Sequence, residues 1–278
     1  MRSVRLFFGF LLVLFGCGSR PGPYQKKDGV WYFGDLCVAE KGPPGFVPLS
    51  GPFAKSSIAG YYRGRAIPDS DGPSFAALSE HYAKDKRHVF YCDTFRKSQE
   101  YYAILHDRTV IMEGADAATF QNLTGGYARD AARVYFQGVA FPVKDAASFT
   151  VLEYSFAKDR FTGYYLQEPI IGSDGPTFTG IDNHYAKDKD HVFYSRLDTG
   201  SAGIAAVKTV ALDGAQPAGF VALDSGYAKS GDIVFYQGHP VHGASAATFT
   251  VQTGLPGGAD ARDDKAIYAA GRKLKALK

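Results

Sequence analysis

The string HYAKDKRHVFY at positions 81–91 returns almost unchanged as HYAKDKDHVFY at positions 184–194. Each copy places a tyrosine, a small residue and a charged pair before a polar turn, with a valine and two aromatic residues after it. Strand-forming residues on both sides of a short polar turn are typical of an antiparallel β-hairpin. The string therefore predicts a hairpin that the chain uses at least twice.

The register of this hairpin follows from the position of its turn. With Lys86 and Arg87 in the turn, the strands on either side pair residue by residue. This register predicts three opposed pairs: Tyr82 with Tyr91, Lys84 with Val89, and Asp85 with His88.

Related ten-residue blocks recur along nearly the whole chain. They begin at Tyr24, Phe53, Tyr82, Tyr127, Phe156, Tyr185, Tyr227 and, in degraded form, Asp260. Successive starts are 29 residues apart in four cases and 45, 42 and 33 residues apart in the others. Ungapped repetition at such a period is the signature of a repeat architecture.

A longer period is superimposed on the short one. The two strings quoted above are 103 residues apart, and so are SDGPSF from Ser70 and SDGPTF from Ser173. The chain therefore contains a duplicated block of three units, at about 53–155 and 156–259, within a single repeat domain over 24–278.

Within a unit, the motif hairpin is followed by a second turn with a recurrent glycine. Gly64, Gly138 and Gly238 occupy this position and supply a positive φ without steric penalty. A third strand and an Asp-capped helical turn, such as Asp116–Phe120, complete the unit. We expect an all-β fold of about eight tandem β-meanders, each of about three strands, in an open stacked array. A closed, propeller-like ring is the alternative, because the longest units have room for a blade.

The motif resembles the repeat of the bacterial DKNYY family, in which a Tyr-Ala-Lys-Asp-Lys-Asn core precedes paired aromatic residues. The copies at Tyr82 and Tyr185 are the most similar, although they read DKR and DKD where the family has DKN. The resemblance extends over essentially the whole mature chain. It implies no activity and no catalytic residues, because the family has no assigned function.

The N-terminus reads as a lipoprotein signal. Arg2 and Arg5 precede an apolar run from Leu6 to Phe15 that is too short for a transmembrane helix. The following Gly-Cys resembles a lipobox, which predicts a signal peptide over 1–16 and lipidation of Cys17 on a tether over 17–23. We expect an extracytoplasmic protein anchored by lipid to a bacterial membrane, the outer membrane in a Gram-negative host.

Charge argues against nucleic acid as a partner. The formal net charge of +3 falls to +1 once Arg2 and Arg5 are removed with the signal peptide. A nearly neutral chain lacks the basic surface that phosphate binding needs.

The remaining cysteines, Cys37 and Cys92, form a possible disulfide, since an exported protein is in an oxidising compartment. A pair of unbridged thiols is the other interpretation, because spacing alone does not fix their distance. The sequence leaves both open.

The histidines are the obvious candidates for a metal site, but their predicted separation argues against one. His81 and His88 are predicted on one face of the hairpin but roughly 13 Å apart along the ladder, too far for one ion to bridge. The chain also lacks linear motifs of catalysis. We therefore expect no metal site, no cofactor and no enzyme activity, and we interpret the repeated Lys and Asp as residues for turn capping and strand pairing.

The two longest units carry insertions that differ between the copies. The first, CDTFRKSQEYYAILHDRT from Cys92, contains the paired Tyr101 and Tyr102, whereas the second, from Ser195, has different residues. Divergent loops on a repeated frame favour specific recognition, and tyrosine is a frequent contact residue. The sequence predicts a non-catalytic binding or scaffolding module of the cell envelope, with Tyr101 and Tyr102 as candidate binding residues. Its partner is an envelope protein or a polysaccharide of the cell wall.

Overall fold

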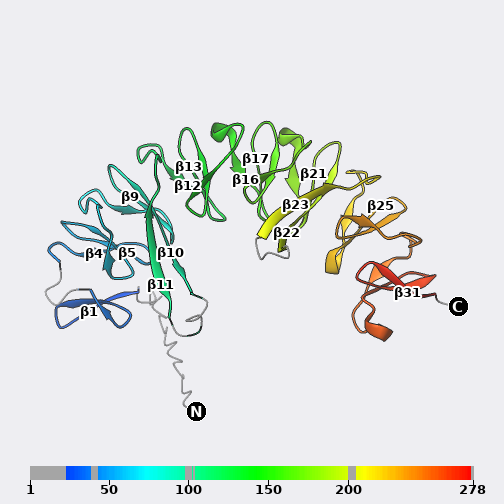
Figure 1. Ribbon diagram of the computed structural model, residues 1–278, viewed down its shortest axis with the longest axis horizontal. Helices are drawn as coiled ribbons and strands as arrows, with labels where there is room; N and C mark the ends of the chain where they lie inside the picture. Colours follow the sequence, from blue (N-terminus) through cyan, green and yellow to red (C-terminus); the bar gives the residue numbers. More distant parts are fainter. Residues whose placement is uncertain (1–22, 39–42, 98–101, 103, 200–204, 277–278) are drawn as a thin grey trace, which may run out of the picture.

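The computed structural model describes residues 23–38, 43–97, 102, 104–199 and 205–276. Small β-sheets follow one another along an open arch, with the two ends of the described chain at opposite feet of the arch (Figure 1). No helix in the described ranges is long and apolar enough to cross a membrane.

Eight antiparallel sheets, here called units 1 to 8, make up the described chain. Unit 1 contains β1 (Tyr24–Lys27), β2 (Val30–Phe33) and β3 (Leu36–Cys37). Unit 2 contains β4 (Val47–Pro48), β5 (Phe53–Lys55), β6 (Gly60–Tyr62) and β7 (Arg65–Ala66). Unit 3 contains β8 (Ala76–Ala77), β9 (Tyr82–Lys84), β10 (Val89–Phe95) and β11 (His106–Ile111). Unit 4 contains β12 (Gln121–Asn122), β13 (Tyr127–Arg129), β14 (Val134–Phe136) and β15 (Val139–Phe141).

The second half repeats this order. Unit 5 contains β16 (Thr150–Val151), β17 (Phe156–Lys158), β18 (Gly163–Tyr165) and β19 (Glu168–Pro169). Unit 6 contains β20 (Thr179–Gly180), β21 (Tyr185–Lys187), β22 (Val192–Thr199) and β23 (Ala205–Ala211). Unit 7 contains β24 (Val221–Ala222), β25 (Tyr227–Ser230), β26 (Ile233–Tyr236) and β27 (His239–Pro240). Unit 8 contains β28 (Thr250–Val251), β29 (Ala261–Arg262), β30 (Ala266–Ala269) and β31 (Arg272–Ala276). Short 3-10 turns occupy Ala146–Ser148, Gly175–Thr177, Asp224–Gly226 and Pro256–Gly258.

The repeat units predicted from the sequence are confirmed. Each of the first seven motif blocks begins at the first residue of a strand, and in unit 8 the strand begins one residue later, at Ala261. The hairpin register is also confirmed, because Tyr82 pairs with Tyr91 and Lys84 pairs with Val89. The ungapped motif therefore fixed both the position of each unit and the pairing within it.

The number of strands per unit differs from the expectation. Units 2 to 8 have four strands where three were expected, because the link before each motif adds a short edge strand such as β8 (Ala76–Ala77). Two-residue strands leave no pattern of alternation that a sequence could reveal. The open array is confirmed and the closed ring is not formed, since the arch of Figure 1 does not return to its start.

The second turn holds neighbouring units close together. Gly138 has a φ of +81°, and a Cβ at this position would lie 2.4 Å from the Cγ of Tyr91 in the preceding unit. Gly238 has the same conformation against Tyr194. Glycine is therefore required here both for the turn and for the close approach of the next unit.

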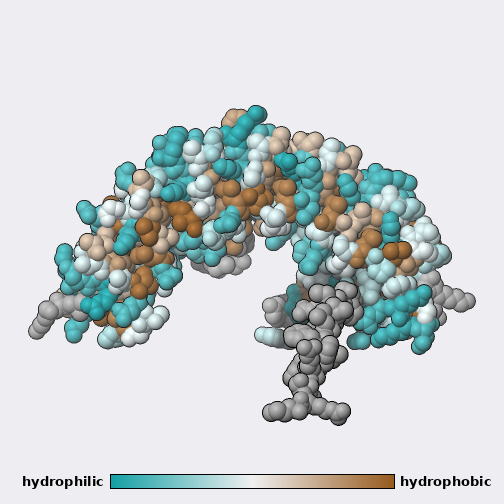
Figure 2. Space-filling view, turned by 180° about the vertical axis from the view of Figure 1, so that it is seen from behind, coloured by the Kyte–Doolittle hydropathy of each residue, from teal (hydrophilic) through white to brown (hydrophobic). Residues whose placement is uncertain are grey.

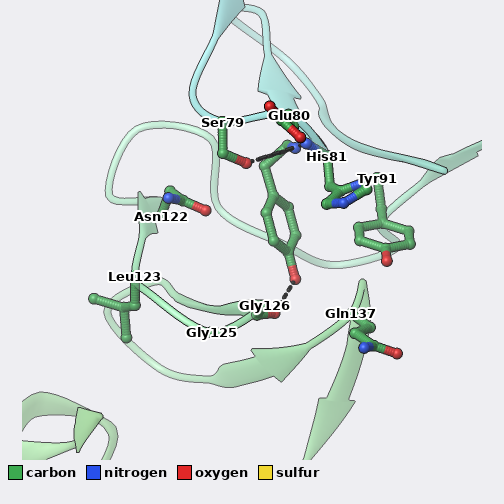
Figure 3. Close-up of a pocket in the computed structure, with 10 residues that line it drawn as sticks. Ser79, Glu80, His81, Tyr91, Asn122, Leu123, Gly125, Gly126 and Gln137 are labelled. Atoms are coloured by element: carbon green, nitrogen blue, oxygen red, sulfur yellow. Dashed lines mark hydrogen bonds between the residues drawn. The ribbon is translucent and has the colours of Figure 1, made fainter. Parts of the chain in front are cut away.

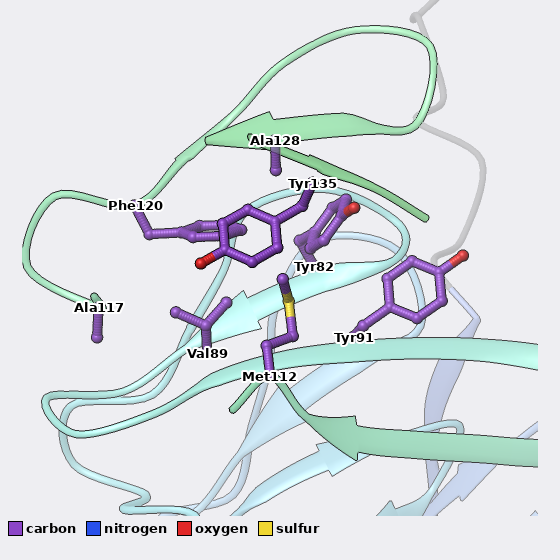
Figure 4. Close-up of a cluster of buried hydrophobic side chains, with 8 residues drawn as sticks. All are labelled: Tyr82, Val89, Tyr91, Met112, Ala117, Phe120, Ala128 and Tyr135. Atoms are coloured by element: carbon purple, nitrogen blue, oxygen red, sulfur yellow. The ribbon is translucent and has the colours of Figure 1, made fainter. Parts of the chain in front are cut away.

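The hydrophobic core lies between units. In one cluster, Tyr82 of unit 3 packs against Phe120 with a ring-centroid distance of 5.6 Å, and Phe120 packs against Tyr135 of unit 4 at 5.7 Å (Figure 4). Further clusters occur at other boundaries between units. Each unit thus buries its aromatic face only against its neighbours, as expected for a repeat array. On the surface, hydrophobic residues alternate with polar ones along the arch (Figure 2).

Two hairpins have longer strands than all the other hairpins of the described chain. β10 and β11 form the first and β22 and β23 form the second, and both extend on the concave side of the arch (Figure 1). They contain the two insertions that differ between the copies. The two divergent insertions therefore lie on the concave side.

Candidate functional site

The aspartate of the motif holds its own turn and the link from the preceding unit. Asp85 is buried, and its Oδ1 accepts hydrogen bonds from the N–H groups of Arg87 and His88, both at 2.7 Å. Its Oδ2 accepts a third from the N–H of Asp71, at 2.8 Å, in the link between units 2 and 3. Although burial opposes the charge, these donors hold the pKa of Asp85 below its ordinary value of 3.8.

The same arrangement recurs along the arch. Equivalent buried aspartates that accept N–H bonds from their turn and from the preceding link are Asp130, Asp159, Asp188 and Asp263. Ser56 and Ser230 take this position in units 2 and 7 and accept similar bonds through their hydroxyl groups. A group used in the same way by so many units is explained by the architecture.

The tyrosine of the motif joins its unit to the next one. The Tyr82 hydroxyl donates to the carbonyl of Gly126 at 3.0 Å and accepts from the N–H of Gly138 at 2.9 Å. Burial raises the pKa of Tyr82 to about 12, so the hydroxyl is protonated and donates at neutral pH. Phe53 and Phe156 occupy this position in units 2 and 5 and lack the hydroxyl.

The lysine of the motif caps the link to the following unit. Lys84 Nζ donates to the carbonyl of Ala117 at 2.8 Å, and Lys187 Nζ donates to the carbonyl of Pro217 at 3.0 Å. The prediction that the repeated Lys and Asp cap turns is therefore confirmed. Tyr, Lys and Asp of the motif thus make contacts within the frame, and candidate sites are sought mainly among the other residues.

A polar cleft lies between units 3 and 4 (Figure 3). It encloses about 380 Å³, with Ser79, Glu80 and His81 on one side. Asn122 and Gln137 of unit 4 line the other side. Hydroxyl, carboxylate, imidazole and amide groups that converge on a small space are suited to hydrogen bonding with a polar ligand such as a sugar.

The histidines support the long hairpins. His81 Nδ1 lies 3.0 Å from the carbonyl oxygen of Cys92, and His184 Nδ1 lies 3.0 Å from that of Ser195. Among the described residues, no group of three or more His, Cys, Asp and Glu side chains is placed to hold a metal ion. His81 and His184 thus make the same structural contact in the two blocks.

The two cysteines that were a possible disulfide are not joined. Cys37 is exposed in β3, whereas Cys92 is buried in β10 within the core beside Phe90. Burial raises the pKa of the Cys92 thiol to about 12. Cys92 is therefore an inert core residue, and its counterpart in the second block is Ser195.

Tyr102 of the first insertion is 96% exposed, and its role as a binding residue stays a prediction. Its neighbour Tyr101 lies outside the described residues, as does Cys17. Close to the tip of the same hairpin, Phe95 stacks on His106 with a ring-centroid distance of 5.3 Å. Aromatic side chains are thus gathered at this end of the first hairpin.

Ion pairs join the first long hairpin to unit 2, and we call this contact corner 1. Asp107 of β11 pairs with Arg63 at 2.8 Å and with Arg65 at 3.3 Å, both from the second turn of unit 2. Gly64 of that turn lies against Phe33 of unit 1. A space of about 400 Å³ lies beside corner 1 and is lined by Arg63 and Thr94 but not by Asp107.

The equivalent contact in the second block, corner 2, has lost these charges. In the alignment of the blocks, Leu166 replaces Arg63, Gln167 replaces Gly64, Glu168 replaces Arg65, Leu197 replaces Thr94 and Val207 replaces Asp107. All five replacements line a cavity of about 650 Å³, together with Phe136, Gln137 and Ala206. The ion pairs of corner 1 have thus become an apolar cavity under the second hairpin.

Only some of the side chains that line corner 2 pack against the hydrophobic core. Leu166 and Val207 are half-buried and pack against the cluster around Tyr165, whereas Leu197 is 54% exposed. Glu168 forms no ion pair with any described residue. An apolar cavity with a few polar groups at its edge is the usual form of a ligand site.

A known family model matches part of the chain between the two most similar copies of the motif, which begin at Tyr82 and Tyr185. Residues 92–168 match the model of the DKNYY family. The matched DKNYY region contains the units that begin at Tyr127 and Phe156, and it ends at Glu168 in corner 2. No curated protein and no solved structure matches the chain.

The sequence contained a signal for the corners that motif analysis missed. Arg63 and Asp107 are far apart in the chain, and both become apolar in the second copy, as Leu166 and Val207. A paired loss of opposite charges between aligned copies indicates contact. The motif consists of residues that recur, whereas this signal lies in residues that change between the copies.

Proposed function

We propose that this protein is a lipid-anchored, non-catalytic binding scaffold of the bacterial cell envelope. The observation that carries the proposal is that the residues that join the units are distinct from the residues that differ between the copies. The polar residues of the motif are used to join units, whereas the long hairpins differ between the copies and extend on the concave side. A fixed frame with divergent exposed loops is the usual form of a recognition protein.

The envelope location depends on the first residues of the chain. Residues 1–16 act as a signal peptide and Cys17 carries the lipid, so the protein is extracytoplasmic and reaches the outer membrane in a Gram-negative host. Nucleic acid is not a partner, and no cofactor takes part. Labelling of cells with a radioactive fatty acid tests the anchor: the wild type takes up label, and Cys17→Ser does not. Label in the variant would contradict the lipid anchor.

The scaffold is tested by cosedimentation of the full chain in lipid nanodiscs with isolated cell-wall sacculi. One sample of sacculi retains its bound proteins and the other is stripped of them. We expect binding to the unstripped sample alone, since a protein partner remains only there. The absence of binding to both samples contradicts a scaffold at the wall.

A second candidate function is recognition of a cell-wall polysaccharide, favoured by the polar cleft between units 3 and 4. Its lining groups, among them Glu80, His81 and Asn122, match the donors and acceptors of sugar hydroxyls. This function predicts binding to stripped sacculi that soluble wall fragments displace. Asn122→Ala should weaken that binding, and retention in unstripped sacculi alone would reject this candidate.

A further inference from the structure

We propose that corner 2 binds an extended peptide segment of a partner protein, with a bulky apolar side chain in the cavity and a Lys or Arg side chain at Glu168. This inference rests on the proposed scaffold function and names the chemistry of its partner. The argument has three parts, which concern the cavity walls, the edge of the sheet and the charge.

The cavity walls select an apolar group. Leu166, Leu197 and Val207 face a space of about 650 Å³, larger than a single side chain, beside Phe136. Burial of an aliphatic or aromatic side chain in such a space removes apolar surface from water on both partners. The aliphatic walls favour an aliphatic or aromatic side chain over a polar group.

The edge of the sheet supplies hydrogen bonds for a peptide backbone. β23 is the outer strand of unit 6, and its only strand partner among the described residues is β22. A segment added beside β23 would pair with its outward N–H and C=O groups, as in other cases of β-strand addition. Because side chains alternate along a strand, every second residue of the segment would point to the same face as Val207, which lines the cavity.

The charge at the edge selects a cation. Glu168 occupies the place of Arg65, whose partner Asp107 is replaced by Val207. Glu168 therefore faces the cavity without an ion pair in the described chain, beside the amide of Gln167. A Lys or Arg two residues from the apolar anchor would lie on the same face of the added strand and reach this carboxylate.

Corner 1 shows the same place bridged by an ion pair. There Arg63 and Asp107 join the turn to the hairpin, and the side chains of the protein itself supply the contacts. Corner 2 keeps the register of the turn, the hairpin and the edge strand but not this bridge, and Gln167 lacks the positive φ of Gly64. The difference gives a direct way to close the site without disturbing the frame.

The test uses a blocked pentapeptide, acetyl-Thr-Phe-Thr-Lys-Thr-amide, added to the full chain in lipid nanodiscs with labelled Leu and Val methyl groups. The control peptide has Glu in place of Lys. We expect shifts of the methyl signals of Leu166, Leu197 and Val207, at a Kd on the order of 1 mM for so short a segment. The control peptide should bind at least about fivefold more weakly, because it meets Glu168 with a like charge.

The decisive variant is Leu166→Arg/Val207→Asp, which copies the bridge of corner 1 into corner 2. Its binding of the Lys peptide should be lost while the methyl spectrum of the other units stays unchanged. Ile58→Arg, at a side chain 68% exposed in unit 2, is the control and should bind normally. Glu168→Gln should keep the binding but lose most of the preference for Lys over Glu.

Methyl shifts outside corner 2, or none, would overturn the site, and equal affinity for both peptides would overturn the cationic partner. The sacculus experiment separates this failure from that of the scaffold. Retention by unstripped sacculi without peptide binding at corner 2 would leave the scaffold standing and reject only the site proposed here. Loss of both results rejects both proposals.

Discussion

Corner 1 and corner 2 occupy the same place in two copies of one block, yet they differ in chemistry. In corner 1, Asp107 pairs with Arg63 and joins the hairpin to the preceding unit. In corner 2, Leu166 and Val207 replace this pair and line a cavity. The frame around them has the same buried aspartate, the same lysine cap and the same hairpin pairing in both copies.

This difference separates two kinds of constraint on a repeat protein. A residue that joins units has to satisfy buried partners on both sides, so a change there leaves a polar group unpaired. A residue at a corner is partly exposed and has fewer buried polar partners to satisfy. Duplication therefore keeps the anchor at Asp85 and Asp188 and changes the corner residues, although Ser56 aligns with Asp159 and Asp130 with Ser230 at the other anchor positions.

Acid should have the largest effect, because it acts on the frame of both blocks at once. Burial opposes the charge of four carboxylates, those of Asp85, Asp130, Asp159 and Asp263. Backbone N–H donors nevertheless hold the pKa of each below 3.8, and a tyrosine hydroxyl adds to this effect in the last three. A depressed pKa contributes stability that is present above the unfolded value of 3.8 and is lost as pH falls through the lower folded value. Urea unfolding from pH 7 down to pH 3 should show stability falling below about pH 4.

Asp85→Asn is the control for this prediction, since it removes one titrating group and keeps the shape. Its stability should change less between pH 5 and pH 3 than that of the wild type. A wild-type stability that is flat over this range would show that the carboxylates are not charged anchors.

Removal of a single anchor should have the next largest effect, of equal size in the two blocks. Asp85→Ala and Asp188→Ala each leave three backbone N–H groups without their acceptor. We expect each to lower the free energy of unfolding by about 3 kcal/mol, as measured by urea titration. Losses that differ by more than about 1 kcal/mol would mean that the frame is not uniform.

Most of this frame could be predicted from the sequence, and the reason is its local character. The hairpin of Tyr82 to Tyr91 is specified by residues that are neighbours in the chain, so its register and turn followed from the motif. The edge strand Ala76–Ala77 could not be predicted, because two residues form a strand only when the motif strand is already beside them. The arch likewise depends on small rotations between units that no single motif encodes.

A charge placed in corner 2 should cost about 2 kcal/mol, because Val207→Asp puts a carboxylate into a cavity whose described lining contains no Lys, Arg or His side chain. The second change, Leu166→Arg, should restore about 1 kcal/mol by forming the bridge seen between Arg63 and Asp107. Urea unfolding of the two single variants and the double variant measures this coupling. Strictly additive losses would show that corner 2 no longer has the geometry of corner 1.

The candidate site could be predicted less well than the frame, for a physical reason. The paired tyrosines of the divergent first insertion are visible in the sequence, and Tyr102 is exposed in the structure. The cavity of corner 2 was missed, since its walls, such as Leu166 and Val207, come from segments distant in sequence and meet only after the units stack. Long-range contacts of this kind are visible in sequence only when two copies are compared position by position.

The tyrosine hydroxyls should contribute about 1 kcal/mol at each boundary and equally in both blocks. Tyr82→Phe and Tyr185→Phe remove the donors to the carbonyls of Gly126 and Gly226 and keep the packing of the ring. Hydrogen exchange of the amides in units 4 and 7 should quicken to the same extent in the two variants. An effect confined to one variant would show that the boundaries differ despite their common contacts.

The smallest effect is expected at corner 1, where Arg63→Leu/Asp107→Val copies the apolar pair of corner 2. The side chains of Arg63 and Asp107 are 33% and 20% exposed, so solvent screens their attraction and the net loss should be under about 1 kcal/mol. Arg65 also loses its partner but is mostly exposed and remains hydrated. If urea unfolding gives a loss as large as that from Asp85→Ala, the corner belongs to the frame, and the freedom of corner 2 to diverge would need another explanation.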